Sequence, residues 1–209
     1  MSLLFETIKC QDRRLHHLHY HNLRVRRNLT YFFGIDTDFD LENTINIPDW
    51  VNNGLYRCRI SYEKEICEIS FFPYEIKHPK IIQLIESESF EYNYKYENRI
   101  QFQKLLESYP HADDVIITKN GLLTDVTYAN LAFFDGQQWF TPNTYLLPGT
   151  KRAYLIDNKQ LTEVKISVKE IRNFERIAFI NAMRDLHISY TFEVNKDVLL
   201  LKNNLSLVL

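Results

Sequence analysis

The sequence is poor in the features that define several large classes of protein. Its 209 residues include only 5 Gly and 6 Pro, so long flexible linkers are not expected. It contains no run of about 18 apolar residues, and we therefore expect no membrane span. The first five residues lack a basic segment ahead of an apolar core, so no signal peptide is expected either.

Charge and cysteine content argue against three further features: a nucleic-acid partner, a disulfide framework and a zinc site. The net charge is -2 at pH 7, and the basic cluster at residues 24–27 is small, which argues against nucleic acid as a partner. The three cysteines are odd in number and lack CxxC spacing. We interpret them as reduced core thiols of a cytoplasmic protein, and not as a disulfide framework or a zinc site: Cys10, Cys58 and Cys67.

What the sequence does contain is enough apolar material for a sizeable core, in one large domain or two small ones that share a cleft. The alternation in residues 55–61 and 66–72 predicts a β-hairpin. Its first strand places Arg57 and Arg59 together on the face opposite the apolar residues. Such a pair is either a solvated face or the lining of an anion-binding cleft.

Four histidines lie close together near the N-terminus. The spacing His17-x-His19-x-His21 suits one face of a strand, but no nearby carboxylate or cysteine completes a metal site, so no metal is expected. The apolar spacing between residues 15 and 29 instead allows a helix that begins near Tyr20.

A polar segment, residues 121–131, separates two apolar strands. Asn-Gly at 120–121 and Asp-Gly at 135–136 predict hairpin turns on either side of it. Asp125 therefore falls where a strand should be buried, and a buried carboxylate needs partners. Two interpretations stay open: the partner is a bound ligand, or the carboxylate ties a loop to backbone amides.

Two further stretches contain residues that could take part in catalysis or ligand binding. Lys95 lies among four aromatic residues, where it is either a nucleophile or a lysine with a solvated tip. Gly149 and Thr150 lead into a predicted helix, whose free N–H groups could bind a phosphate.

Taken in order, these stretches resemble the class IV aminotransferases, the fold-type IV pyridoxal-phosphate (PLP) enzymes. That family includes branched-chain and D-amino-acid aminotransferases and aminodeoxychorismate lyase. The similarity extends over nearly the whole chain. It rests on five motifs: His21-x-x-Arg24, Lys95-x-x-Asn98-Arg99, Thr124-Asp125 through Asn130-Leu131, Leu147-Pro148-Gly149-Thr150-x-Arg152, and Asn181-Ala182-Met183.

The resemblance implies a role for each motif. Lys95 matches the Schiff-base lysine, and Asp125 matches the acidic partner of the pyridine nitrogen. Arg24 matches the arginine that binds the cofactor phosphate. The same phosphate would be held by the turn at Gly149 and the backbone N–H groups of Thr150 and Lys151. The remaining candidates are Asn181 for the cofactor and the following residues for the substrate: Arg57, Arg59, Tyr128, Met183 and Arg184.

The sequence also departs from the family pattern. Many members have Glu where this chain has the shorter Asp125, which would have to lie closer to the ring. The chain is short for the family and begins almost directly at Phe5, so an N-terminal strand or two would be missing. This departure bears on the substrate pocket more than on the cofactor chemistry.

The resemblance implies an α+β fold with a small N-terminal domain over residues 1–92, a larger C-terminal domain over 93–209, and PLP between them. It implies a cytoplasmic homodimer acting on a small amino substrate. The motifs around Lys95 and Asn181 favour aminodeoxychorismate lyase, which releases pyruvate and leaves p-aminobenzoate. The alternatives are a branched-chain or D-amino-acid transaminase and a non-catalytic binding relative.

Overall fold

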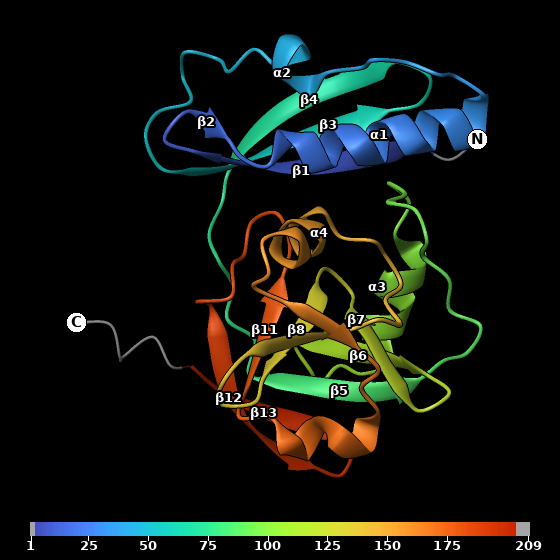
Figure 1. The fold of residues 1–209 in the computed structure, drawn as a ribbon, viewed down its shortest axis with the longest axis vertical. Helices are drawn as coiled ribbons and strands as arrows, with labels where there is room; N and C mark the ends of the chain where they lie inside the picture. The colour runs from blue at the N-terminus through green and yellow to red at the C-terminus, as the bar shows by residue number, and fades with distance from the viewer. Residues whose placement is uncertain (1–2, 204–209) are drawn as a thin grey trace. The chain divides into compact units, whose positions relative to one another are not determined.

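The structure is a computed structural model and describes residues 3–203. The chain divides into two compact units, which we describe separately (Figure 1). Unit 1 comprises the residues up to Ile76 together with Tyr94–Asn98, and unit 2 comprises Lys77–Asn93 and the residues from Arg99 onward. The division differs from the expected boundary at residue 92, because the chain enters unit 2 earlier and then returns to unit 1 for five residues.

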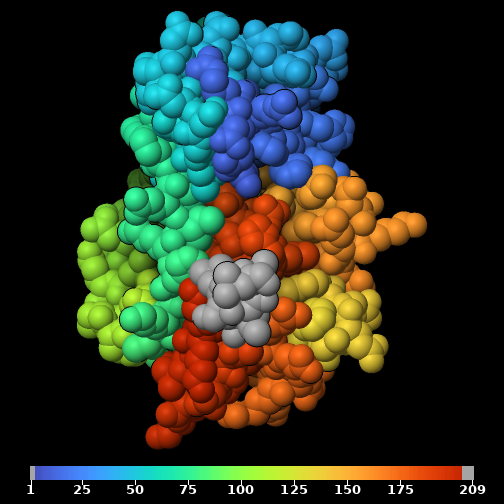
Figure 2. Space-filling view, turned by 90° about the vertical axis from the view of Figure 1, so that its left-hand side faces the viewer, coloured from blue at the N-terminus to red at the C-terminus, as the bar shows by residue number. Residues whose placement is uncertain are grey.

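Unit 1 is an antiparallel sheet with helices against one face (Figure 1). The strand order is β2-β1-β3-β4. The elements are β1 (Leu4–Gln11), β2 (Arg14–Leu15), α1 (Leu18–Phe33), α2 (Leu41–Thr44), β3 (Leu55–Tyr62) and β4 (Ile66–Pro73). The space-filling view shows the side chains of residues 3–76 packed into one continuous body (Figure 2).

Strand alternation explains which residues form the core of unit 1. Ile8 on β1 lies opposite Cys58 on β3, and both are fully buried with Cys10 and Ile60 against the helices. The hairpin predicted over residues 55–72 is confirmed as β3 and β4. The other face of the sheet carries the polar residues of the same strands.

The segment Tyr94–Asn98 joins unit 1 along the edge of β1. Phe5 donates its backbone N–H to the carbonyl of Lys95 (3.0 Å), and Glu97 donates to the carbonyl of Leu3 (2.8 Å). The pairing is possible because β2 covers only the far end of β1, at Cys10 and Gln11. Lys95 is therefore carried by unit 1, although the residues on both sides of this segment belong to unit 2.

Unit 2 contains a nine-stranded mixed sheet in the order β10-β9-β8-β11-β12-β13-β5-β6-β7. The strands are β5 (Ile81–Glu86), β6 (Asp114–Lys119), β7 (Leu122–Val126), β8 (Asn130–Phe134), β9 (Trp139–Pro142), β10 (Thr162–Val164), β11 (Arg176–Ile180), β12 (Ser189–Asn195) and β13 (Val198–Asn203). The helices are α3 (Ile100–Glu107), α4 (Thr150–Asp157) and the 3-10 helix η1 (Val168–Asn173).

The sheet of unit 2 closes on itself, because β7 also pairs with β8. The pair that makes this closure is Asp125 opposite Asn130. The predicted turn between β6 and β7 is confirmed, since Asn120 (φ 52°) and Gly121 (φ 69°) both have left-handed backbone conformations. The predicted α+β class is likewise confirmed by the strands and helices of the two units.

Over residues 3–203, the structure contains no helix that is both long enough and apolar enough to span a membrane.

Candidate functional site

Lys95 lies half-buried on the polar side of unit 1. Its Nζ atom is 4.6 Å from the centroid of the Phe5 ring, and Phe5 is almost fully buried. The Arg59 guanidinium lies 4.2 Å from the same centroid. One aromatic ring on β1 thus contacts both cations, which makes the arginine on β3 a neighbour of the candidate lysine.

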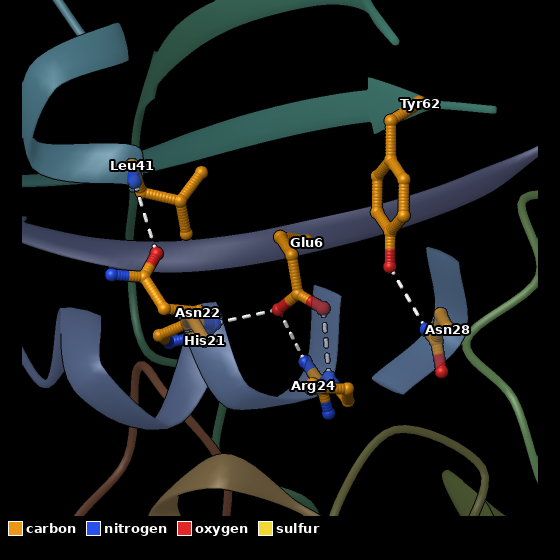
Figure 3. Close-up of polar contacts among 7 residues, drawn as sticks. All are labelled: Glu6, His21, Asn22, Arg24, Asn28, Leu41 and Tyr62. Atoms are coloured by element: carbon orange, nitrogen blue, oxygen red, sulfur yellow. Dashed lines mark hydrogen bonds and ion pairs between the residues drawn. The ribbon is translucent and has the colours of Figure 1, made fainter. Parts of the chain in front are cut away.

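A buried charge network lies on the opposite, helix-covered side of the sheet (Figure 3). Glu6 on β1 accepts hydrogen bonds from Arg24 Nε (2.7 Å) and Arg24 Nη2 (2.5 Å), and its Oε2 lies 2.6 Å from His21 Nδ1. Both partners come from α1, where residues three apart share one face of the helix. All three side chains are at least nine-tenths buried.

The network fixes the ionisation of its members. Burial alone would raise the pKa of Glu6, but the charges and hydrogen bonds of Arg24 and His21 lower it to about 2. Burial lowers the pKa of His21, and the positive charges of Arg24 and Lys95 lower it further. The hydrogen bond and the negative charge of Glu6 raise the pKa of His21 but do not outweigh these effects. At neutral pH the group is therefore a carboxylate paired bidentately with a guanidinium.

This pairing changes the interpretation of Arg24. We expected a cation reserved for the cofactor phosphate, but two of its three nitrogens donate to Glu6. A guanidinium has five N–H donors, so the pairing with Glu6 does not by itself exclude an anion contact, and Glu6 holds the plane of the group. The phosphate role of Arg24 stays a prediction.

The two arginines of β3 share one sheet face, as their alternation predicted, but their partners differ. Arg59 Nη2 donates to Glu97 (2.5 Å), so its charge is already paired. Arg57 stacks over the Phe72 ring at 5.1 Å, and its Nε atom is buried without a hydrogen-bond acceptor among the described residues. Of these two arginines, Arg57 is the one with a buried nitrogen that lacks an acceptor within residues 3–203.

Asp125 lies at the closure of the unit 2 sheet and is 4 % exposed. Its Oδ1 accepts from Asn130 Nδ2 (2.8 Å), and its Oδ2 accepts from the backbone N–H groups of Leu146 and Leu147 (both 2.9 Å). The carboxylate therefore ties the 146–147 loop to the sheet. This agrees with the interpretation in which Asp125 binds backbone amides of a loop. Its two oxygens can still accept another N–H, so the pairing with a pyridine nitrogen stays a prediction.

Burial dominates the ionisation of Asp125. It raises the pKa of this carboxyl to about 6, although three donors act to lower it. Asp114 on β6 behaves in the same way: burial raises its pKa to about 6, while the N–H and hydroxyl groups of Thr127 oppose the shift. The turn between β7 and β8 is thus framed by two buried carboxyls.

Gly149 lies against the same polar group. A Cβ atom at this position would come within 1.9 Å of Asn130 Oδ1. Asn130 cannot easily withdraw, because its Nδ2 donates both to Asp125 and to the carbonyl of Leu147 (2.9 Å). Gly149 is required here for close packing, since its φ of -73° is accessible to any residue.

Helix α4 begins directly after Gly149, and its first residues are buried. Thr150 is 6 % exposed and Lys151 is 3 % exposed. The ammonium group of Lys151 is paired with Asp185. The structure thus brings the start of α4 next to the loop that follows β11, where residues 181–184 were predicted to contribute.

That loop holds three more predicted residues. Asn181 Nδ2 donates to the carbonyl of Tyr128 (3.1 Å), and Asn181 Oδ1 accepts from the N–H of Met183 (2.9 Å). Asn181 therefore connects the turn after β7 to the loop after β11. Tyr128 is half-buried and Met183 is 3 % exposed, so Met183 acts mainly as packing.

Arg184 does not suit the substrate contact predicted for it. It is 1 % exposed, and each of its three nitrogens has a partner within unit 2. The acceptors are the carbonyls of Phe179 and Lys77 and the hydroxyl of Tyr190. A buried guanidinium with this arrangement holds chain segments together and has little capacity left for a ligand.

Several residues of the site escaped the sequence analysis. Glu6 was detectable, because an acidic residue between Leu4 and Ile8 occupies an inward-facing strand position. Asn130 appeared in a motif, but without its contact to Asp125. The helix that was expected to begin near Tyr20 is α1, which begins at Leu18. His19 and His21 lie in this helix, where alternate residues do not share a face.

The residues of unit 2 fit PLP in two respects. Helix α4 begins at Thr150, directly after Gly149, and the backbone N–H groups at a helix start suit a phosphate. Asp125 is a buried acceptor able to pair with a protonated ring nitrogen. Unit 1, described separately, contains Lys95, a primary amine of the kind that can bond to a carbonyl carbon.

Comparison with known proteins agrees with this match. The family model described as amino-transferase class IV matches residues 84–188. An uncharacterized protein of Haemophilus influenzae is 35% identical over 188 residues, which cover 89% of this chain and all of that protein. The crystal structure of a candidate 4-amino-4-deoxychorismate lyase from Haemophilus somnus is 30% identical, with a TM-score of 0.81 over 89% of this chain and 98% of that one.

A more distant structure shows the same fold. A hypothetical aminotransferase from Mycobacterium tuberculosis, solved in a PLP-bound form, is 15% identical and has a TM-score of 0.67 over 87% of this chain and 78% of its own. The fold is therefore that of the fold-type IV PLP enzymes, as predicted. With the family model matching half of its length and close relatives over most of it, the chain belongs to the class IV amino-transferase family.

Proposed function

We propose that this protein is a PLP-dependent enzyme and that Lys95 is its cofactor lysine. The observation that carries the proposal is the position of Lys95, half-buried on a segment hydrogen-bonded to β1, with its Nζ atom fixed over Phe5. A primary amine held in this way can bond to a carbonyl carbon, which is the reaction that attaches PLP to its enzymes.

PLP, when bound, supplies an electron sink for the negative charge that develops on the substrate α-carbon. The roles that we propose for the protein residues follow from their chemistry. Asp125 would accept a hydrogen bond from the ring nitrogen and keep it protonated. Arg24 and the N–H groups of Thr150 and Lys151 would hold the phosphate. Lys95 would hold the cofactor through its amine and would take the substrate's α-proton as a general base.

For the reaction we propose a 4-amino-4-deoxychorismate lyase activity. Two observations support it. The buried Nε of Arg57 has no acceptor in the part of the chain that the structure describes, and it suits a carboxylate of a ring-bearing substrate. In addition, the relative from Haemophilus somnus that is 30% identical is a candidate for the same activity. With Arg59 paired to Glu97 and Arg184 bonded internally, Arg57 remains the arginine that we assign to the substrate.

The test uses the purified PLP-loaded protein with aminodeoxychorismate and no 2-oxo acid. A lyase releases pyruvate and p-aminobenzoate in equal amounts, measured by a lactate dehydrogenase coupled assay and by fluorescence. Arg57→Met should raise KM at least tenfold, because a charge-assisted hydrogen bond to the substrate is lost. Arg172→Met, at an exposed arginine of η1, is the matched control and should leave KM unchanged.

The competing outcome is a transaminase. It would give neither product from aminodeoxychorismate, and it would form pyruvate from alanine only when 2-oxoglutarate is supplied as acceptor. That result would overturn the lyase proposal while retaining Lys95 as the cofactor lysine. Absence of any lysine-bound cofactor after borohydride reduction would overturn the assignment of an enzyme altogether.

A further inference from the structure

We infer that Glu97 is a positioning residue for Lys95, held in place by Arg59 and Ser61 of β3. The inference rests on the proposed function in one respect, the assignment of Lys95 as the cofactor lysine. Glu97 itself was not among the predicted site residues, and its role follows from the contacts of unit 1 alone.

The segment that carries Lys95 is attached to the sheet by only a short pairing at the end of β1. It pairs with the first residues of β1, through the backbone hydrogen bonds that join Phe5 to Lys95 and Glu97 to Leu3, and through a bridge between Leu4 and Tyr96. Short pairings at the end of an edge strand open more readily than the interior of a sheet. A catalytic amine, however, needs a position fixed to within about 0.5 Å.

Side-chain alternation gives the segment two different anchors. Tyr94 and Tyr96 face the apolar cluster under α1, where the Phe32 ring lies 4.6 Å and 6.2 Å from their ring centroids. Lys95 and Glu97 then face the opposite side of the sheet. The aromatic anchor fixes one face of the segment, and the face that carries the lysine needs a second one.

Glu97 supplies this second anchor. Its Oε1 accepts hydrogen bonds from Arg59 Nη2 (2.5 Å) and Ser61 Oγ (2.9 Å). Arg59 in turn lies over the Phe5 ring that also contacts Lys95 Nζ. The carboxylate, the guanidinium, the ring and the lysine therefore form one contiguous group, in which β3 and β1 both restrain the segment.

The anchor is charged under physiological conditions. Partial burial raises the pKa of Glu97, but the hydrogen bonds and the charge of Arg59, together with Ser61, outweigh it and lower the pKa below its usual value. The contribution to stability is thus complete above the unfolded-state pKa and is lost only as the pH falls through the lowered value. The anchor should therefore act over the whole range in which PLP enzymes are assayed.

The first test measures hydrogen–deuterium exchange of the full-length protein without added cofactor. In Glu97→Gln, the amides of Phe5 and Glu97 should exchange about three- to tenfold faster, because a partly exposed charged pair is lost. Ser61→Ala should show a smaller increase. The control, Glu68→Gln, removes an exposed carboxylate from β4 of the same sheet and should change neither amide.

The second test follows the attachment of PLP to Lys95, by borohydride reduction and peptide mass analysis. Glu97→Gln should slow this attachment severalfold, and the charge-swapped pair Arg59→Glu with Glu97→Arg should recover part of the rate. Unchanged exchange at both amides in Glu97→Gln would overturn the inference, whatever the cofactor does. If the exchange rises but PLP is found on another lysine, the assignment of Lys95 as the cofactor lysine fails. Glu97 would then restrain the segment that carries Lys95 without contributing to catalysis.

Discussion

The closest packing in the candidate site, between Gly149 and Asn130, leads to a prediction that can be tested by unfolding experiments. Replacing Gly149 with Ala would place a Cβ atom 1.9 Å from Asn130 Oδ1 and 3.1 Å from its Cγ, far inside contact distance. The backbone itself permits the change, because Gly149 has φ -73° and ψ 137°. Any loss of stability must therefore come from the displacement of Asn130.

The decrease in the free energy of unfolding can be estimated from the two hydrogen bonds that Asn130 would lose. One goes to the buried carboxylate of Asp125 (2.8 Å) and the other to the carbonyl of Leu147 (2.9 Å). A hydrogen bond to a charged group contributes about 1.5–3 kcal/mol and one to a neutral group about 1 kcal/mol. Gly149→Ala should therefore lower the free energy of unfolding by about 2.5–4 kcal/mol.

A double-mutant cycle separates this cause from others. Asn130→Ala removes the same two hydrogen bonds directly, and in that background Gly149→Ala should cost less than about 1 kcal/mol, because the obstructing oxygen is gone. Urea unfolding followed by circular dichroism gives the four free energies. If the two substitutions are additive, or if Gly149→Ala alone leaves the midpoint unchanged, then the packing against Asn130 is not what requires glycine here.

The remaining predictions concern charge. Lys95→Ala should abolish both turnover and the visible absorption of bound PLP; a borohydride-stable adduct at another single lysine would contradict the assignment. Arg24→Ala should weaken PLP binding at least tenfold in an absorbance titration, and unchanged affinity would remove its phosphate role. The raised pKa of Asp114, about 6, means that the folded state holds this proton more tightly. Its contribution therefore falls as pH rises from about 4 to about 6, by about 2–3 kcal/mol, and Asp114→Asn should flatten that decline in pH-dependent urea unfolding.

The sequence was most informative where a local pattern determines a local structure. Alternation predicted β3 and β4, and the Asn120-Gly121 pair predicted a turn whose left-handed backbone the structure contains. Motif spacing also selected residues that lie together in unit 2. Asp125 contacts Asn130, which packs against Gly149, and Asn181 contacts Tyr128.

Long-range charge pairing was not predictable in the same way. Arg24 and Arg59 were recognised as cations, but their carboxylate partners, Glu6 and Glu97, lie 18 and 38 residues away in the chain. Which acid meets which base depends on strand register and on the return of residues 94–98 to β1, and neither is encoded in a short window. The same return explains why a single boundary at residue 92 did not describe the two units.

The pairing of Arg24 with Glu6 also determines how it could bind an anion. The ion pair is buried, and the lowered pKa of Glu6, about 2, keeps the carboxylate charged at neutral pH. The net charge of Arg24 is therefore largely offset, and an anion would gain more from directed N–H hydrogen bonds than from this charge. Removing Glu6 would increase that net charge but release the guanidinium from its fixed plane. The loss of Glu6 would therefore have two opposite effects on anion affinity, one through charge and one through orientation. Glu6→Gln should show which effect is larger. Weaker PLP binding in this variant would mean that orientation matters more than charge.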